Sequence, residues 1–230
     1  MSGGPGREPE IEPAVEPAVE PEVVLAGEGL RVVRRGQVIL DDVALRVRPG
    51  ERVAVVGPSG SGKTTLLTLL AGVDRPDAGR VTLDGVPLRA PTPRIALVLQ
   101  GYGLLTLLTA AENVQVALRA AGHAASDAQA RSAVALDGLA LADRADHLVE
   151  ELSGGQQQRV AVARALAVAP RVVLADEPTA EQDAEHRELV VEALLGVTAG
   201  GAALVVATHD PAIAGRCDRV VEIRHGRVVL

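Results

Sequence analysis

A glycine-rich turn between an apolar strand and a helix constrains this chain more than any other feature. Residues 57–64 read GPSGSGKT and satisfy the pattern G-x-x-x-x-G-K-[ST]. The β-branched run Arg52–Val56 precedes the turn, and the compact apolar segment Thr64–Ala71 follows it. Glycines allow successive backbone N–H groups to curl around a phosphate chain, and the N-terminus of the next helix adds its dipole. The turn therefore predicts a phosphate-binding loop, a feature that kinases, GTPases and ATPases share.

Two side chains of this loop indicate how a nucleotide would be held. We expect Lys63 to reach the β- and γ-phosphates, and Thr64 to place its hydroxyl on Mg²⁺. The alternative is a glycine-rich turn with an exposed lysine, but Lys63 is the only lysine in the chain, which weakens that interpretation. The candidate nucleotide-binding residues of this segment are Gly57, Pro58, Ser59, Gly60, Ser61, Gly62, Lys63, Thr64 and Thr65.

The rest of the chain alternates between strand and helix patterns. Short β-branched runs divided by turn residues occur early, at Leu30–Val33, Val38–Leu40 and Val43–Val47. Helical spacing prevails in residues 104–169, as in Ala110–Ala121 and Ser126–Leu136. Strand-like runs return around the helical segment Ala184–Leu195, at Arg171–Ala175, Ala202–Ala207 and Arg219–Ile223. This order predicts an α/β layer structure with parallel strands and a helical insertion.

The composition suits one folded domain preceded by an acidic tail. A chain of 230 residues that is 47% hydrophobic can bury a core of Ala, Val and Leu over residues 23–230. Residues 1–22 repeat Glu-Pro-Ala-Val and carry six glutamates against Arg7 alone, so we expect them to be disordered. The remainder is close to neutral, and Tyr102 is its only Phe, Tyr or Trp, which argues against nucleic acid or anionic lipid as a partner.

Cysteine content and hydropathy bear on where the protein works. Cys217 is the only cysteine, so no intramolecular disulfide can form, as is usual in a reducing cytosol. The N-terminus lacks a basic region followed by an apolar one, and no apolar run reaches the roughly 18 residues that a membrane span needs. We expect a protein that is neither secreted nor membrane-spanning by itself.

A second glycine motif selects among the phosphate-binding classes. Residues 152–160 read LSGGQQQRV, the wording of the ABC signature, and the chain therefore resembles the ABC ATPase family. The resemblance implies that Ser153, Gly154 and Gly155 open a helix whose N-terminus faces the γ-phosphate held by a second copy of the chain. Gln156 joins them as a candidate nucleotide contact. The alternative is an ordinary serine N-cap beside glycines in a loop.

Two adjacent carboxylates follow an apolar strand further along the chain. The run Arg171–Ala175 leads to Asp176 and Glu177, which resembles the Walker B strand of the same family. The resemblance implies that Asp176 holds Mg²⁺ through water and that Glu177 polarises the attacking water as a general base. Paired acids at a strand end are often merely solvated, but here they follow the signature closely, as in the family.

Two further positions match the catalytic pattern of the family. His209, in the word Thr-His-Asp, corresponds to the switch histidine that contacts the γ-phosphate and the attacking water. Gln100 corresponds to the Q-loop glutamine, a ligand of Mg²⁺ and water that moves with the permease. The loop after Gln100 is expected to expose Tyr102, Leu104 and Leu105 as an apolar docking surface, and the alternative is a buried connector.

The resemblance covers about residues 23–230 and implies a fold. That fold is a P-loop NTPase (RecA-like) core with an N-terminal antiparallel β-subdomain and an inserted α-helical subdomain at about residues 101–169. Where the family stacks adenine on an aromatic residue, this chain offers only Val33, Arg34 or Arg35. An arginine could stack on the base instead, but weaker base affinity or selectivity is expected.

A second departure lies after the Walker B strand, in residues 178–183, which we call the D-loop. The family commonly has a small residue and a leucine before the aspartate, whereas this chain reads PTAEQD. Asp183 is kept, and Gln182 replaces the leucine. We expect this change to affect communication between the two nucleotide sites of a dimer, while the hydrolytic residues are intact.

The resemblance implies a transport ATPase. Two copies would close on ATP, hydrolyse it and drive a separate integral membrane permease from the cytoplasmic face of the membrane. The words LADEPT, QQQR and ATHDP are most similar to ATPases of the lipoprotein-release and macrolide-export group, which implies export or extraction. A soluble ABC ATPase remains an alternative, although the chain has no room for a long coiled coil or a second nucleotide domain. A weakly hydrolysing nucleotide switch is the other, supported only by the missing aromatic residue.

Overall fold

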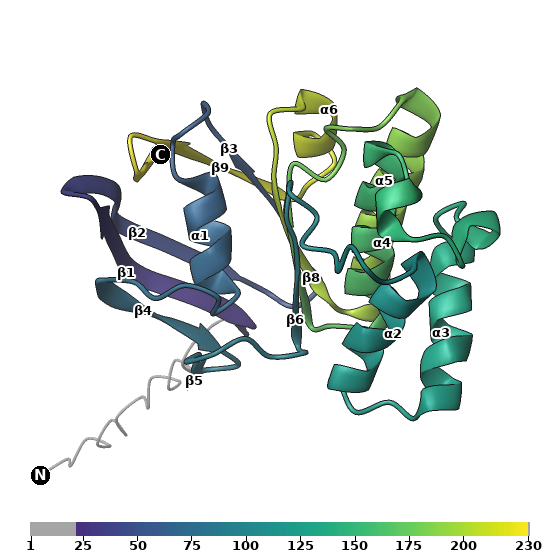
Figure 1. Cartoon of the computed structure of the whole chain (residues 1–230). Helices are drawn as coiled ribbons and strands as arrows, with labels where there is room; N and C mark the ends of the chain where they lie inside the picture. Colours follow the sequence, from purple (N-terminus) through teal and green to yellow (C-terminus); the bar gives the residue numbers. More distant parts are fainter. Residues whose placement is uncertain (1–21, 230) are drawn as a thin grey trace, which may run out of the picture.

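The computed structural model describes residues 22–229. The acidic tail predicted for residues 1–22 therefore lies outside the described part, apart from Glu22. Two β-sheets and two sets of helices build the described part of the chain (Figure 1).

A six-stranded sheet forms the centre of the molecule. In spatial order its strands are β10 (Arg227–Val229), β9 (Arg219–Arg224), β3 (Arg52–Val56), β8 (Ala203–Ala207), β7 (Val172–Asp176) and β6 (Ile95–Val98). The strands from β9 to β6 run parallel, which confirms the predicted parallel core. β10 was not predicted, and it returns antiparallel to β9 at one edge.

A four-stranded antiparallel sheet lies on one side of the first sheet. Its strands, in spatial order, are β2 (Gln37–Val47), β1 (Leu25–Arg34), β4 (Ala78–Leu83) and β5 (Val86–Pro87). The sequence divided β2 into two runs, but the structure keeps one strand. The register of β2 against β1 shifts between Leu40 and Val43, and Asp42, at φ 55°, forms a β-bulge there.

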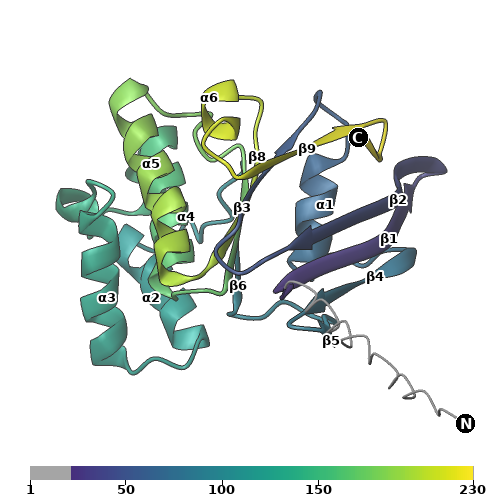
Figure 2. The ribbon, with the colours of Figure 1, turned by 180° about the vertical axis from the view of Figure 1, so that it is seen from behind.

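Helices cover the central sheet on both faces. α1 (Lys63–Leu70) lies between the two sheets (Figure 1). The helices on the opposite face are α2 (Ala110–Ala120), α3 (Ala125–Asp137), α4 (Gly154–Ala167) and α5 (Ala184–Gly196) (Figure 2). Short helical turns connect these elements, at η1 (Ala142–Arg144), η2 (Val149–Glu151), η3 (Val197–Gly200) and α6 (Pro211–Ala214).

The first three helices of that face pack on one another. Contacts join α2 to α3, α2 to α4 and α3 to α4, which agrees with the helical spacing of this region. The division of the chain at residues 101 and 169 stays a prediction. No helix within residues 22–229 combines the length and the apolar character that crossing a bilayer requires.

Alternate residues of the central strands supply two separate cores. Val53 and Val55 of β3 pack with α1 and the antiparallel sheet, whereas Ala54 packs with the helices of the opposite face. β7 and β8 are buried at every position because both of their faces are covered. The loops at the ends of these strands are therefore attached to a rigid, fully packed scaffold.

Candidate nucleotide-binding site

Three parallel strands end at the same edge of the central sheet and bring the predicted residues together. β3 leads into residues 57–64, β7 ends at Asp176, and β8 leads to His209. Two backbone bonds join the strand ends, because the Glu177 N–H donates to Ala207 O at 2.9 Å and the Thr208 N–H donates to Val55 O at 3.1 Å. The carboxyl ends of parallel strands are the usual position of ligand sites in such sheets.

The backbone of residues 57–64, the P-loop, requires its glycines. Gly57 has φ 150°, and a Cβ there would lie 2.1 Å from the carbonyl oxygen of Ile223. Gly62 has φ 106° and immediately precedes α1, where a Cβ would lie 2.6 Å from the side chain of Leu40. Any larger residue at either position would collide with a neighbouring strand or loop, so packing fixes the shape of the loop.

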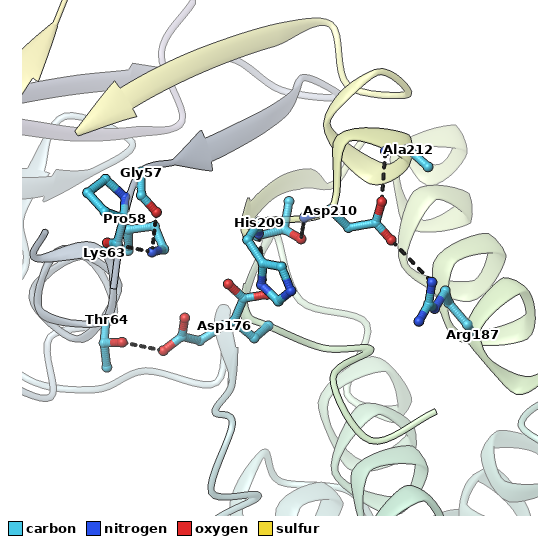
Figure 3. A network of polar contacts seen from close by, with 11 residues as sticks. Gly57, Pro58, Lys63, Thr64, Asp176, Arg187, His209, Asp210 and Ala212 are labelled. Atoms are coloured by element: carbon cyan, nitrogen blue, oxygen red, sulfur yellow. Dashed lines mark hydrogen bonds and ion pairs between the residues drawn. The ribbon is translucent and has the colours of Figure 1, made fainter. Parts of the chain in front are cut away.

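The ammonium group of Lys63 lies over this loop. It donates hydrogen bonds to the carbonyl oxygens of Gly57 at 2.8 Å and of Pro58 at 3.2 Å (Figure 3). A cavity of about 660 Å³ opens beside the loop, and His209 and His225 are among its lining residues. Of the predicted site residues, Gly57, Pro58 and His209 line this cavity, whereas Lys63 and Thr64 do not.

Thr64 and Asp176 form the second polar pair of the site. The Thr64 hydroxyl donates to Asp176 Oδ2 at 2.6 Å (Figure 3). Asp176 is only 3% exposed. Burial raises the pKa of its carboxyl above the usual value, and the charge of Glu177 raises it further, against the lowering effects of Thr64 and Lys63. The pair supplies oxygen atoms of the kind that Mg²⁺ prefers.

Glu177 and His209 form the third pair. His209 Nδ1 lies 2.9 Å from Glu177 Oε2, and the backbone N–H of His209 donates to the same oxygen at 3.4 Å. The Glu177 side chain is 15% exposed and that of His209 is 76% exposed. Glu177 also has φ 46°, a left-handed conformation that is uncommon for glutamate and that clusters at functional sites.

The histidine loop is anchored by contacts that the sequence did not indicate. Asp210 caps α6 by accepting from the backbone N–H of Ala212 at 2.8 Å. Its other carboxylate oxygen lies 3.6 Å from Arg187 of α5 (Figure 3). The backbone N–H of Asp210 donates to the Thr208 hydroxyl at 3.0 Å. Asp210 is thereby fixed on both sides, which holds His209 in front of Glu177.

The signature begins α4 with a capping box. The Ser153 hydroxyl accepts from the backbone N–H of Gln156 at 3.3 Å, and the Gln156 side chain accepts from the backbone N–H of Ser153 at 2.9 Å. The alternative interpretation of Ser153 as an N-cap is therefore also a correct description. The two interpretations are compatible, since a capped N-terminus can still present backbone N–H groups to an anion.

The structure does not bring Gln100 and the signature into the polar network around Asp176. Gln100 lies exposed after β6, with no hydrogen bond from its side chain to the described residues. The next residues are held by α4, because Arg164 donates to the carbonyl oxygens of Gly103 at 2.6 Å and of Tyr102 at 3.0 Å. Arg164 is a link that only the tertiary structure reveals.

The exposed residues of the predicted docking loop differ in part from those expected. Tyr102 and Leu104 pack against the helical core, so they are not freely exposed as expected. Leu105 is 51% exposed and Leu107 is 83% exposed. Asn113, itself buried, holds the loop by accepting from the N–H of Leu105 and donating to its carbonyl oxygen. The apolar surface therefore consists of Leu105 and Leu107 on a fixed loop.

Comparison with known proteins identifies the family. The model of the ABC transporter family matches residues 40–180. The chain belongs to the ABC transporter family.

Two curated relatives have the same level of identity to this ABC cassette but different lengths. The lipoprotein-releasing system ATP-binding protein LolD of Chromohalobacter salexigens is 42% identical over 90% of this chain and 93% of its own length. The macrolide export ATP-binding/permease protein MacB of Brucella melitensis is 42% identical over 83% of this chain but only 31% of its own length. The cassette thus spans about a third of the second relative.

A solved ABC cassette shares the fold. The dimeric post-hydrolysis state of the ATP-binding cassette MJ0796 bound to ADP and Pi superposes with a TM-score of 0.83 at 32% identity, over 90% of this chain and 97% of that chain. The predicted P-loop NTPase architecture and the predicted class, an ATPase subunit of an ABC transporter, are confirmed. The roles of single residues are not tested by these comparisons and stay predictions.

The oxygen ligands of the cassette fit a magnesium ion held partly by a nucleotide. No group of three or more His, Cys, Asp or Glu side chains suited to a metal occurs within residues 22–229. Mg²⁺ is usually bound by one or two protein oxygens together with phosphate and water. The adjacent oxygens of Thr64 and Asp176 match this requirement.

Proposed function

We propose that this chain is the ATP-hydrolysing subunit of an ABC transporter of the lipoprotein-release or macrolide-export type. The observation that carries the proposal is the adjacency of two polar pairs at the end of the P-loop strand. One pair, Thr64 with Asp176, suits a metal, and the other, Glu177 with His209, suits water activation. Both pairs lie at the same sheet edge as Lys63.

The first step is binding of ATP with Mg²⁺. The P-loop backbone and Lys63 would hold the phosphates. Thr64, together with Asp176 through water, would hold the ion, with Gln100 as a further ligand. When bound, Mg²⁺ neutralises charge on the phosphate oxygens. Ionised Asp176 is disfavoured by burial, so a cation beside it should bind with release of any proton that it carries.

The second step is hydrolysis. A water molecule attacks the γ-phosphorus, its proton passes to the Glu177 carboxylate, and the bond to the oxygen that bridges the β- and γ-phosphorus atoms breaks, leaving ADP and phosphate. His209 keeps the carboxylate oriented through the 2.9 Å contact and would itself contact the γ-phosphate. Exposure of His209 leaves it free to change partners when the nucleotide enters.

The third component is a second copy of the chain. The N-terminus of α4, with Ser153, Gly154, Gly155 and Gln156, would face the γ-phosphate in the P-loop of the partner. The dimeric state of the related cassette supports this arrangement. Two nucleotides would thus be enclosed between two copies.

The fourth component is a membrane permease. Leu105 and Leu107 offer it an apolar surface on a loop that α4 and Asn113 hold in place. The relative MacB is named as an ATP-binding and permease protein, and LolD as the ATP-binding protein of a lipoprotein-releasing system. By analogy, this chain would act at the cytoplasmic face of the membrane, bound to a separate permease.

One observation favours a weakly hydrolysing switch as a second candidate. The turn after β1 has no aromatic residue, and the guanidinium of Arg34 is held by Asp74 at 2.7 Å. Arg35, exposed and at φ 52°, is then the cation left to stack on a base. Weak base binding would lower ATP affinity without removing Glu177 or His209.

Affinity purification from detergent-solubilised membranes in the presence of ATP tests the transport function. Mass spectrometry should identify a polytopic permease with a large extracytoplasmic domain bound to the tagged chain. A Leu105→Ser, Leu107→Ser double variant should lose that permease, whereas Val134→Ser, an exposed change on α3, should retain it. Recovery of soluble proteins alone would contradict the transport function and support a soluble ABC ATPase.

A further inference from the structure

The D-loop crosses directly over the N-terminus of α4. The Gln182 side chain donates to the carbonyl oxygen of Gly155 at 2.8 Å, and Gln182 is only 9% exposed. A Cβ at Gly155 would lie 2.7 Å from the carbonyl oxygen of Glu181. Gln182, which replaces the family's leucine, therefore links the D-loop to the signature, and we call this contact the clamp.

The clamp brings a carboxylate to the start of the helix. A Cβ at Gly154 would lie 2.8 Å from Glu181 Oε2 and 3.1 Å from the hydroxyl of Tyr102. Glu181 and Tyr102 thus flank the same glycine. Burial raises the pKa of the Tyr102 hydroxyl, and the negative charge of Glu181 raises it further, which agrees with this proximity.

The N-terminus of α4 attracts the negative charge of the Glu181 carboxylate. The first N–H groups of an α-helix have no partner within the helix, and α4 runs for 14 residues from this end. No hydrogen bond joins Glu181 to these N–H groups within the described residues, so its carboxylate acts on the helix end through its charge. The phosphate of a nucleotide presented by a second copy would need the same helix end. Two anions cannot occupy one helix end without repulsion, so the carboxylate has to move away before the phosphate binds.

We propose that Glu181 is an internal competitor of the nucleotide phosphate at the signature and that it raises the ATP concentration at which two copies pair. The proposal rests on the nucleotide sandwich described under the proposed function. Gln182 keeps the D-loop backbone on α4, while the exposed Glu181 side chain is free to swing away. The departure of the D-loop from the family pattern then sets the threshold for pairing.

Sedimentation against ATP concentration tests the proposal. All chains carry Glu177→Gln, which slows hydrolysis, and they are compared with and without Glu181→Gln. The added change should lower the ATP concentration for half-maximal pairing about threefold or more at low salt, because it removes one charge from each of two helix ends. The difference should shrink at about 0.5 M salt, because screening weakens the repulsion.

Glu185→Gln is the matched control. It removes the same charge from an exposed position in the first turn of α5, and it should shift the midpoint less than twofold. If the parent and Glu181→Gln pair at the same ATP concentration, the role of Glu181 is refuted, but the nucleotide sandwich is not. Failure of the parent to pair at any ATP concentration would overturn the nucleotide sandwich and the inference with it.

Discussion

At the scale of single residues, the neighbours Asp176 and Glu177 lie in different environments. Asp176 is buried at the end of β7, whereas Glu177 lies partly exposed in a left-handed conformation beside His209. Burial makes the charge of Asp176 costly in the chain alone, and a cation would offset that cost. Strain and an unfavourable charge at one sheet edge indicate that function, rather than stability, determines these two residues.

Asp176→Asn should stabilise the ligand-free chain. The folded pKa of Asp176 is raised above its usual 3.8, so its contribution to stability is present below that pH and is lost as pH rises through the folded value. At pH 7 the neutral amide removes this loss while still accepting from Thr64, and Tm should rise about 2–4 °C. Thermal unfolding with and without MgATP measures both effects.

The same variant should lose the additional stabilisation that Mg²⁺ gives to the ATP complex. Asp146→Asn, an exposed change in the loop after η1, serves as control and should leave both temperatures unchanged. A lower Tm for ligand-free Asp176→Asn would contradict the account of buried charge. Undiminished stabilisation by Mg²⁺ would contradict the assigned metal ligand.

Glu177→Gln should reduce ATP turnover by about 10²- to 10⁴-fold, because a general base contributes that much. The amide oxygen can still accept from the backbone N–H of His209, so ATP affinity should change little. Glu185→Gln, an equal charge change on α5, should retain full turnover. Turnover of Glu177→Gln at the rate of the unchanged chain would refute the assignment of the base.

At the scale of elements, α4 contacts two loops. Its N-terminus meets the D-loop through Gln182, and its third turn holds residues 102 and 103 through Arg164. The loop that follows Gln100 and the D-loop are therefore both fixed to the same helix.

Arg164→Leu should destabilise the fold by about 1–3 kcal/mol, because two carbonyl oxygens lose their charged donor. Arg131→Leu, which removes a surface ion pair with Asp127, should cost only about 0–1 kcal/mol. Urea unfolding compares the two. Equal costs would show that the contact of Arg164 with the loop after Gln100 does not contribute to stability.

Sequence periodicity anticipated most elements, and β4 is one of the strands that it missed. Helices α2 and α3 were visible because their apolar residues recur at helical spacing. β4 was missed because its first half, Ala78–Arg80, is exposed and lacks an apolar alternation, and its partner β1 lies far away in the sequence. Local patterns do not contain the information that such long-range pairing uses.

In the candidate site too, some residues could be predicted from the sequence, whereas others are revealed only by tertiary contacts. The P-loop was visible as a motif after an apolar strand, and the resemblance to the ABC ATPase family singled out the acidic pair and His209, each of which also follows an apolar strand. Gln182 and Arg164 could not be assigned roles, because a hydrogen bond to a distant backbone carbonyl leaves no spacing signal. Gln182 was noticed only as a departure from the family pattern.

At the scale of the whole molecule, the P-loop and the signature of one chain belong to different parts of the fold. The P-loop stands on the central sheet, whereas the signature begins α4 among the helices (Figure 1). The signature has no hydrogen bond to the polar network around Asp176 within the described part of one chain. Complete sites are therefore expected only when two copies meet, each supplying what the other lacks.

ATP turnover as a function of chain concentration distinguishes sites shared by two copies from sites complete within one chain. If each site is built from two copies, turnover per chain should rise with concentration and level off once sedimentation shows mainly dimers. Ser153→Ala, Gly154→Asp should remain inactive at every concentration, because the helix end can no longer accept a phosphate. Constant turnover per chain, extending down to concentrations at which only the 23.7 kDa monomer is present, would contradict the account.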